Sequence, residues 1–170
     1  MKLTNFFELN FKDLKNFLIK DLAVEEKKVS MRSKQIWQSV YKKGSFEINN
    51  LTTFPLELRN KLNRLMSLQR PKIANTQTSN DGTIKWLIKL FDGNEVECVY
   101  IPEKTRATLC ISSQVGCTLN CKFCHTGTQR LVKNLSYAEI VNQVVIAKEQ
   151  INDWDEKKKI TNIVLMGMGE

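Results

Sequence analysis

The 170-residue sequence has a single histidine, His125, and lacks any apolar run of about 18 residues, any internal repeat and any low-complexity tract. Without a long apolar run, no membrane span is expected. Polar and charged residues follow Met1 within a few positions, unlike the apolar core of a signal peptide. The five cysteines, an odd number, have metal-ligand spacing, so we expect a protein of the reducing cytoplasm.

The composition is that of a globular protein with a positive charge. Hydrophobic residues make up 42% of the chain, enough for a core in one or two domains. Lys and Arg number 26 against 18 Asp and Glu, a formal net charge of +8. Such a surplus suits a polyanionic partner, first of all a nucleic acid, but a solvated lysine-rich surface would give the same balance.

Three of the cysteines, Cys117, Cys121 and Cys124, have the spacing C-x3-C-x2-C, with an aromatic residue directly before the last. Three thiolates on one short loop can hold three irons of a [4Fe–4S] cluster, and the fourth iron then stays open to a small molecule. Clusters that only carry electrons usually have four cysteine ligands. The spacing therefore favours an open-iron cluster.

Other readings of these cysteines stay open. Structural zinc sites generally pair two C-x2-C or C-x2-H units, whereas this chain has one such unit. His125 adjoins Cys124, and adjacent side chains diverge, so the two rarely complete one tetrahedron. Disulfides need an oxidising compartment, and simple inert thiols are the last alternative.

The N-terminal region, residues 1–73, is expected to be a small helical accessory domain. Apolar residues at helical spacing predict three helices, around Phe11, after Ser33 and from Pro55, which suits a first helical turn. The exposed face is rich in lysine: Lys12, Lys15, Lys20, Lys27, Lys28, Lys34, Lys42 and Lys43. It could contact RNA or serve only as a packing domain.

Residues 74–82 are small or polar and predict a linker. A β-hairpin should follow, with strands at 83–90 and 95–101 around an Asp-Gly turn. On the return strand Val96, Cys98 and Tyr100 should face one side; Glu97 and Val99 should face the other.

A βαβ unit of a parallel sheet is expected next, which makes the fold class α/β. Its strands are the apolar runs 107–113 and 160–166, and the cysteine loop follows the first. Ser136 and Glu139 form a capping box at the start of the helix. Ile140, Val144, Ala147 and Ile151 then stripe one helical face.

The sequence closes on a glycine-rich turn, Gly-Met-Gly-Glu at 167–170. In parallel sheets ligands bind beyond the C-terminal ends of the strands, so this turn and the cysteine loop should converge on one edge. Two parallel strands and one helix cannot close a barrel. We therefore expect the front part of a longer enzyme, although a natural truncation would look the same.

Residues 82–170 resemble the RNA adenine methyltransferases of the RlmN/Cfr family, which are radical S-adenosylmethionine (SAM) enzymes. The matching strings are Asp-Gly-Thr-Ile-Lys-Trp (81–86), Val-Glu-Cys-Val-Tyr-Ile-Pro-Glu (96–103), Arg-Ala-Thr-Leu-Cys-Ile-Ser-Ser-Gln-Val-Gly-Cys (106–117), the cysteine loop, Asn-Leu-Ser-Tyr-Ala-Glu-Ile (134–140) and Ile-Thr-Asn-Ile-Val-Leu-Met-Gly-Met-Gly-Glu (160–170). The helical region resembles the family's accessory RNA-binding domain more loosely.

The resemblance implies a fold and a domain plan. It predicts a helical accessory domain (1–73), a linker (74–82), and then a hairpin with the first βαβ unit of a radical SAM partial (β/α) barrel (83–170), truncated. The implied activity is methylation of adenine C2 in 23S rRNA and tRNA. Methylation at C8, as in Cfr, and a non-catalytic RNA-binding remnant are the alternatives.

The implied mechanism uses two molecules of SAM. The first methylates a cysteine in the C-terminal part of the enzyme, and the second binds the cluster and yields the radical that removes a hydrogen from that methyl group. The carbon radical adds to adenine, a base removes the C2 proton, and a thiol resolves the enzyme–RNA crosslink by disulfide exchange.

The family's cofactor sites fall on five positions of this chain. Cys117, Cys121 and Cys124 match the ligands of the [4Fe–4S] cluster. Gly169 and Glu170 match the motif that receives the amino group of SAM, where a carboxylate can accept a charge-assisted hydrogen bond from the ammonium. Without the resemblance, the glycine motif would be an ordinary turn.

Two further residues match catalytic positions. Glu97 matches the proposed proton acceptor, although Glu95 and Glu103 are comparable strand carboxylates, and Cys110 matches the resolving thiol, although a buried cysteine is often just a small hydrophobe. Cys98 matches no family role and is expected to be structural.

The resemblance also implies partners: 23S rRNA, tRNA and a reducing protein such as flavodoxin, with a monomeric chain and no membrane. The sequence departs from the family in lacking the methyl-carrying cysteine and the proline after Gly-Glu, because it stops at Glu170. His125 stands where small residues are common. These 170 residues alone are therefore not expected to complete the reaction.

Overall fold

The computed structural model describes residues 3–119, 121–155, 157 and 159–169. The chain divides into two compact units, Met1–Gln69 (unit 1) and Arg70–Glu170 (unit 2). Each unit has its own secondary structure and its own buried core.

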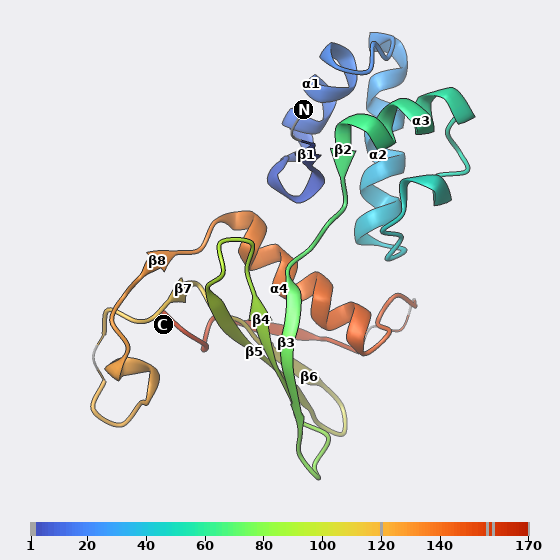
Figure 1. Ribbon diagram of the computed structural model, residues 1–170. Coiled ribbons are helices and arrows are strands. Elements are labelled where there is room, and N and C mark those ends of the chain that lie inside the picture. The colour runs from blue at the N-terminus through green and yellow to red at the C-terminus, as the bar shows by residue number, and fades with distance from the viewer. Residues whose placement is uncertain (1–2, 120, 156, 158, 170) are drawn as a thin grey trace. The chain divides into compact units, whose positions relative to one another are not determined.

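Residues 3–69 of unit 1 contain three helices: α1 (Phe11–Lys20), α2 (Glu26–Tyr41) and α3 (Leu56–Leu65) (Figure 1). Two short 3-10 turns, η1 (Phe6–Glu8) and η2 (Ile48–Asn50), and a two-residue parallel pairing of β1 (Thr4–Asn5) with β2 (Met66–Ser67) complete it. The three predicted helices are confirmed, but α2 begins at Glu26 rather than after Ser33, which is buried within the helix. Pro55 lies one residue outside the helix, at the N-cap of α3.

A cluster of aromatic rings packs beside the mainly aliphatic core of unit 1. The rings of Phe6, Phe7, Phe11, Trp37 and Tyr41 contact one another, with Trp37 and Tyr41 4.8 Å apart between centroids. The Asn10 side chain caps α1 by accepting the backbone N–H groups of Lys12 and Asp13, both at 2.9 Å. Local capping and ring packing therefore stabilise the same short helices.

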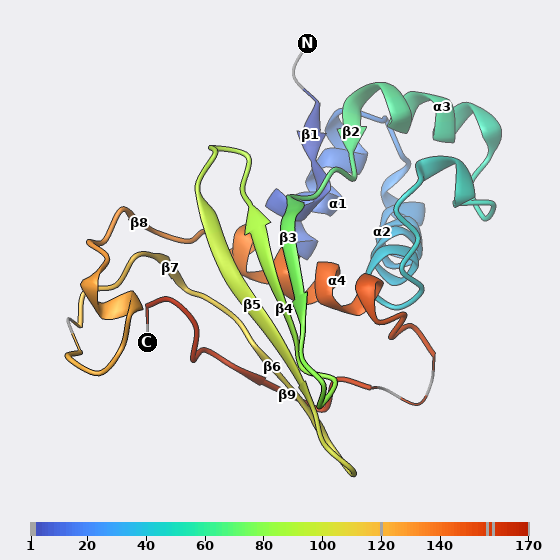
Figure 2. The same cartoon turned by 60° about the horizontal axis from the view of Figure 1, so that its bottom comes forward.

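Unit 2 is built on a five-stranded sheet in the order β3-β4-β5-β6-β9 (Figure 2). Its strands are β3 (Lys72–Thr78), β4 (Ile84–Lys89), β5 (Glu95–Pro102), β6 (Ala107–Cys110) and β9 (Asn162–Val164). The first four pair antiparallel, and β9 pairs parallel to β6 across helix α4 (Tyr137–Gln150). The predicted hairpin and βαβ unit are both confirmed.

The segment 74–82 does not form the predicted linker, because β3 pairs with β4 as far as Thr78. The strand is at the edge of the sheet, its side chains after Ile73 are exposed, and its register shifts between Ile73 and Asn75. An edge strand with both faces exposed to solvent can have the polar composition of a loop. For this reason the sequence predicted a linker at 74–82.

Helix α4 covers one face of the sheet. Ser136 caps it, and the reciprocal bonds of the capping box with Glu139 are both present, as predicted. The predicted stripe packs on the core, with Ala147 fully buried. The buried cluster that α4 and the sheet share is Trp86, Ile88, Leu90, Val96, Cys98, Leu109, Ile111, Val115, Leu135, Ile146, Ala147 and Met168.

The register assigns the strand residues to two faces. Cys98 pairs with Trp86, and Tyr100 pairs with Leu109, so these residues share the face that α4 covers. Side chains alternate along a strand, so Glu97 and Val99 face the opposite side, as predicted. We call this second side the open face.

Both parallel strands are shorter than predicted. The run 107–113 leaves the sheet after Cys110, and the run 160–166 is a strand only at 162–164. The second run was expected to be buried, but Ile163 is 51% exposed and Met166 is 61% exposed. Burial was predicted because the run is apolar. In the structure β9 is an edge strand, so its side chains are partly exposed.

Candidate functional site

The cysteine loop starts from a short ladder at the end of the sheet. After β6 the chain forms β7 (Gln114–Val115), which pairs antiparallel with β8 (Lys133–Asn134), and the loop lies between them. The N–H of Cys117 donates to Gln129 O at 3.2 Å, which closes the loop at its base. The short helix η3 (Thr126–Thr128) lies inside it.

The three candidate ligands differ in exposure. Cys117 is 8% exposed, whereas Cys121 and Cys124 are half-buried. The Sγ of Cys117 accepts the N–H of Leu119 at 3.5 Å, and the N–H of Cys124 donates to Cys121 O at 3.1 Å. Phe123, between the last two cysteines, is 94% exposed. The loop therefore presents its second half to solvent.

Gly116 fixes the start of the loop. Its φ is +78°, a conformation that favours glycine, and a Cβ there would lie 2.0 Å from Arg130 O. No side chain fits between these two backbone segments, so the chain can fold back on itself only with glycine at this position.

The donor set of the loop fits an iron–sulfur cluster by its chemistry, because three thiols lie within eight consecutive residues. All five cysteines lie in the part of the chain that the structure describes, and none is in a disulfide. Among the described residues, no three His, Cys, Asp or Glu side chains are gathered closely enough to hold a metal ion. The thiols are thus on one loop but not preassembled.

The glycine-rich turn lies directly against the start of the cysteine loop. The N–H groups of Ser113 and Gln114 donate to Met168 O at 2.8 and 3.1 Å, and Ser113 Oγ donates to Gly169 O at 2.8 Å. The expected convergence of turn and loop on one sheet end is therefore present. Glu170, the other predicted SAM-binding residue, lies outside the described residues.

The two predicted catalytic residues share the open face. Cys110 pairs with Val99, and Glu97 is two residues along the same strand, so Glu97 and Cys110 are diagonal neighbours. Cys110 is half-buried, and the half-exposed Glu97 carboxylate accepts a 3.0 Å bond from Lys85 Nζ. The alternative carboxylates, Glu95 and Glu103, are both exposed.

Cys98 has the surroundings of a structural residue. It is fully buried on the α4 face, and its Sγ is 4.0 Å from Gln143 O. Burial, with a smaller effect from the nearby Cys110, raises the pKa of the Cys98 thiol to about 12. Such a thiol is inert at neutral pH.

Sequence reasoning missed Ser112 and Gln143, which are both fully buried and join these pieces. A signal was present, because Gln143 is a polar residue directly before Val144 in the apolar stripe of α4. A buried amide in such a stripe needs hydrogen-bond partners, and this need could have pointed to a role.

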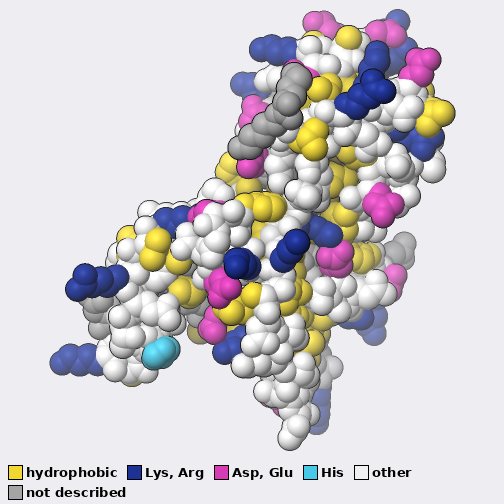
Figure 3. All heavy atoms as spheres, viewed as in Figure 1, with side chains coloured by type: hydrophobic (Ala, Val, Ile, Leu, Met, Phe, Trp, Pro, Cys, Tyr) yellow, Lys and Arg dark blue, Asp and Glu magenta, His cyan; other side chains and the backbone are white. Residues whose placement is uncertain are grey.

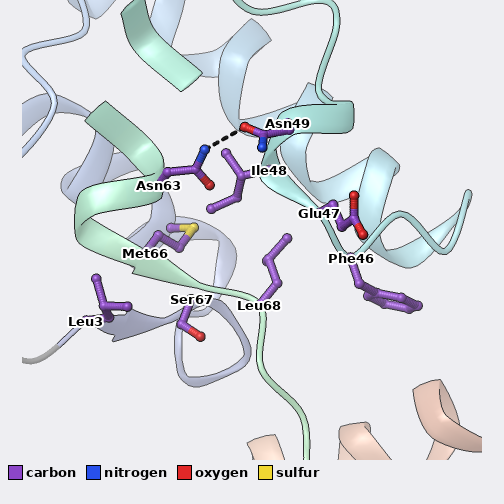
Figure 4. A pocket seen from close by; sticks show the side chains of 9 residues that line it. All are labelled: Leu3, Phe46, Glu47, Ile48, Asn49, Asn63, Met66, Ser67 and Leu68. Carbon is purple, nitrogen blue, oxygen red and sulfur yellow. Dashed lines mark hydrogen bonds between the residues drawn. The ribbon is translucent and has the colours of Figure 1, made fainter. Parts of the chain in front are cut away.

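The described part of unit 1 carries a surplus of basic side chains and has surface pockets. Lys and Arg side chains are scattered over its surface with Asp and Glu between them (Figure 3). One pocket of about 250 Å³ has Ile48, Met66 and Leu68 in its lining, together with a hydrogen bond from Asn63 Nδ2 to Asn49 Oδ1 at 2.6 Å (Figure 4). A second, of about 210 Å³, is lined mostly by Gln, Ser, Thr and Asn side chains.

No helix in the described parts of the chain is long and apolar enough to cross a membrane.

The sequence is similar to curated dual-specificity RNA methyltransferases named RlmN, while no protein-family model matches it. The RlmN of Bradyrhizobium sp. strain ORS 278 is 49% identical over 162 residues, which are 88% of this chain and 40% of that protein. The RlmN of Rhodopseudomonas palustris strain BisB5 is 49% identical over 152 residues, 82% of this chain and 38% of that protein. The chain thus spans about 40% of the length of the curated relatives it matches.

The fold is similar to a solved structure. A radical SAM methyltransferase from Sphaerobacter thermophilus superposes with a TM-score of 0.82 at 33% identity. The match covers 98% of this chain and 47% of that one. The mixed α/β architecture, in which a helical unit precedes a sheet unit, is therefore that of a radical SAM methyltransferase over the matched part.

Proposed function

We propose that this chain, a homologue of the RlmN-type RNA methyltransferases, is the cluster-binding and SAM-binding part of an enzyme that methylates C2 of adenine in 23S rRNA and tRNA. One observation carries the proposal: the cysteine loop and the glycine turn, far apart in sequence, lie together at one end of the sheet. Three hydrogen bonds attach the turn to Ser113 and Gln114, the residues that lead into the loop.

The loop and the turn would share the work of binding. Cys117, Cys121 and Cys124 would hold a [4Fe–4S] cluster after the exposed half of the loop moves, while Gly169 and Glu170 would receive the amino group of SAM. When bound, the cluster supplies the electron that cleaves SAM. Burial of Cys117 keeps one thiol at the protected base of the site.

The open face of the sheet would supply the acid–base and thiol chemistry. Glu97 would accept the proton from adenine C2, and the 3.0 Å contact with Lys85 Nζ would orient its carboxylate on the open face. Cys110 would resolve the enzyme–RNA crosslink: its sulfur would bond to the sulfur of the methyl-carrying cysteine as the C–S bond of the crosslink breaks, and the released carbon would take up the hydrogen of the thiol. The half-buried position of Cys110 on that face lets a substrate adduct reach it. The methyl-carrying cysteine has no counterpart in this chain, so this part alone would not complete the reaction.

Unit 1 would contact the RNA. The domain plan that we propose, an accessory domain at 1–73 before the radical SAM part, is close to the division into Met1–Gln69 and Arg70–Glu170. The full enzyme would act in the cytoplasm as a monomer, with 23S rRNA and tRNA as substrates and a flavodoxin-like protein as reductant. Methylation at C8 is not favoured, because the curated relatives carry the name RlmN.

The first test is anaerobic reconstitution with iron and sulfide, followed by EPR of the reduced protein with and without SAM. We expect a cluster signal that shifts on addition of SAM and is lost in Cys121→Ala. Cys98→Ala is the matched control and should keep the signal, because Cys98 lies in the core away from the loop. Zinc at one per chain without iron would contradict the proposal.

RNA binding by unit 1 is tested by the salt dependence of affinity for a 23S rRNA fragment. Replacing the exposed Lys34 with Glu should weaken binding and lower the salt slope by about 1 if its ammonium contacts a phosphate. Lys27→Glu is the control, because Lys27 is already ion-paired with Glu25 at 3.1 Å. Binding that does not respond to salt would contradict an RNA-contacting role.

A further inference from the structure

A buried amide stands at the point where strand β6 leaves the sheet. The Oε1 of Gln143 accepts the N–H of Ser112 at 2.8 Å, and its Nε2 donates to Ser112 O at 2.9 Å. These are the two bonds that a neighbouring strand would make, so one side chain of α4 extends the pairing of the strand beyond Cys110. Both residues are fully buried.

The hydroxyl of Ser112 joins two more segments to this pair. Its Oγ donates to Glu97 O at 2.7 Å and accepts the N–H of Met168 at 3.0 Å. One buried hydroxyl therefore anchors β5 at Glu97, the candidate proton acceptor, and anchors the glycine turn at Met168. These two residues are 71 positions apart in the sequence. Each of these polar groups would be costly to leave unpaired in the interior.

The turn lies so close to this network that side chains are excluded. A Cβ at Gly167 would lie 2.6 Å from Ser112 Oγ, and a Cβ at Gly169, where φ is +90°, would lie 2.4 Å from Gln114 Cγ. The 3.0 Å hydrogen bond from the Met168 N–H to Ser112 Oγ couples the position of Ser112 to the turn. A shift of Ser112 would therefore displace Met168 and Gly169.

We propose that Ser112 and Gln143 are positioning residues that set the place of the SAM-binding turn relative to the Glu97 backbone, with helix α4 as the rigid reference. The inference rests on the proposed function, since it assigns the turn to SAM. Neither residue touches a substrate in this role. Ser112 acts through the main chain of residues 97 and 168, and Gln143 acts through Ser112.

The experiment measures the dissociation constant of SAM on the anaerobically reconstituted chain, together with its iron content and the hydrogen exchange of residues 167–169. Ser112→Ala and Gln143→Leu remove the network, and Ser112→Thr retains the hydroxyl. Asn142→Leu is the matched control, because Asn142 is the adjacent amide of α4, is 3% exposed, and has an Oδ1 that accepts no hydrogen bond from the described residues.

We expect Ser112→Ala and Gln143→Leu to weaken SAM binding at least tenfold and to speed exchange at the Met168 N–H, with iron content unchanged. Ser112→Thr and Asn142→Leu should stay within about threefold of the wild type. Faster exchange with unchanged SAM affinity would overturn the inference, because it would leave only a structural role. A wild-type chain that takes up a cluster but no SAM would overturn the proposed function and this role with it.

Discussion

The two faces of the sheet in unit 2 differ in what they bury and in what they expose. On the face that α4 covers, Trp86, Cys98 and Leu109 are at most 1% exposed. On the open face, Glu97 and Cys110 are half-buried, and Glu97 is ion-paired with Lys85. Residues adjacent in sequence, such as Glu97 and Cys98, therefore have opposite roles.

Burial, and not residue type, separates the candidate catalytic thiol from the structural one. Cys98 and Cys110 are the same residue type on neighbouring strands, β5 and β6. The alternation of the strands places one against α4 and leaves the other accessible.

The largest expected difference is in thiol reactivity. At pH 8 a thiol with a pKa of about 12 is ionised to about 10⁻⁴, whereas an ordinary thiol with a pKa of about 8.5 is about one quarter ionised. Burial adds to this difference, so Cys98 should react with iodoacetamide at least about a thousandfold more slowly than an exposed cysteine. Cys110 should be labelled long before it.

Mass spectrometry of labelled peptides from the native protein measures both rates, and labelling in denaturant is the control for peptide detection. Similar native rates for Cys98 and Cys110 would mean that α4 does not seal its face of the sheet.

Truncation of core residues should come next in size. Trp86→Ala removes a 1%-exposed ring between the sheet and α4 and should cost about 3–5 kcal/mol. Leu87→Ala, one residue along on the open face, should cost about 1 kcal/mol because Leu87 is only half-buried. Native-state hydrogen exchange of the α4 amides gives both free energies of unfolding. Equal losses would contradict the division into two faces.

An acid-sensitive contact at the start of α4 should make a smaller contribution to the free energy of unfolding. Lys133 bonds to both Asp92, in the turn between β4 and β5, and Glu139, in the first turn of α4. The bond from Lys133 lowers the pKa of Asp92 from 3.8 to about 2. Its stabilising effect is therefore full above about pH 4 and is lost as the pH falls through about 2.

Because the Asp92 side chain is 39% exposed, solvent screening reduces its contribution to about 1 kcal/mol. Asp92→Asn should lose this amount at pH 6 and should match the wild type near pH 2. Urea unfolding at both pH values measures the difference, and a variant equally destabilised at both would contradict the ionic origin.

The smallest effect is expected for the ion pair on the open face. Lys85 and Glu97 have side chains that are 41% and 45% exposed, so Lys85→Met should change the free energy of unfolding by less than about 0.5 kcal/mol. Urea unfolding at low and high salt is the measurement. A loss above about 1 kcal/mol would show that the open face is as well shielded from solvent as the face that α4 covers.

Much of unit 2 could be predicted from the sequence, because the signals are local. The hairpin followed from its alternating strands and its Asp-Gly turn, and the start of α4 followed from the Ser136–Glu139 capping box. The failures, β3 and the buried state of β9, concern edge strands. Their composition reflects neighbours that the local sequence does not reveal.

The available chemical groups can be read from the amino acids alone: three thiols at C-x3-C-x2-C spacing, a glycine-rich turn, and Glu97 in a strand. Which of these groups meet depends on contacts between distant segments of the fold. Pairing of β5 with β6 brings Glu97 beside Cys110, and Ser112 with Gln143 ties both strands to the turn. These contacts join residues distant in the chain, and their partners are fixed by packing rather than by local preference.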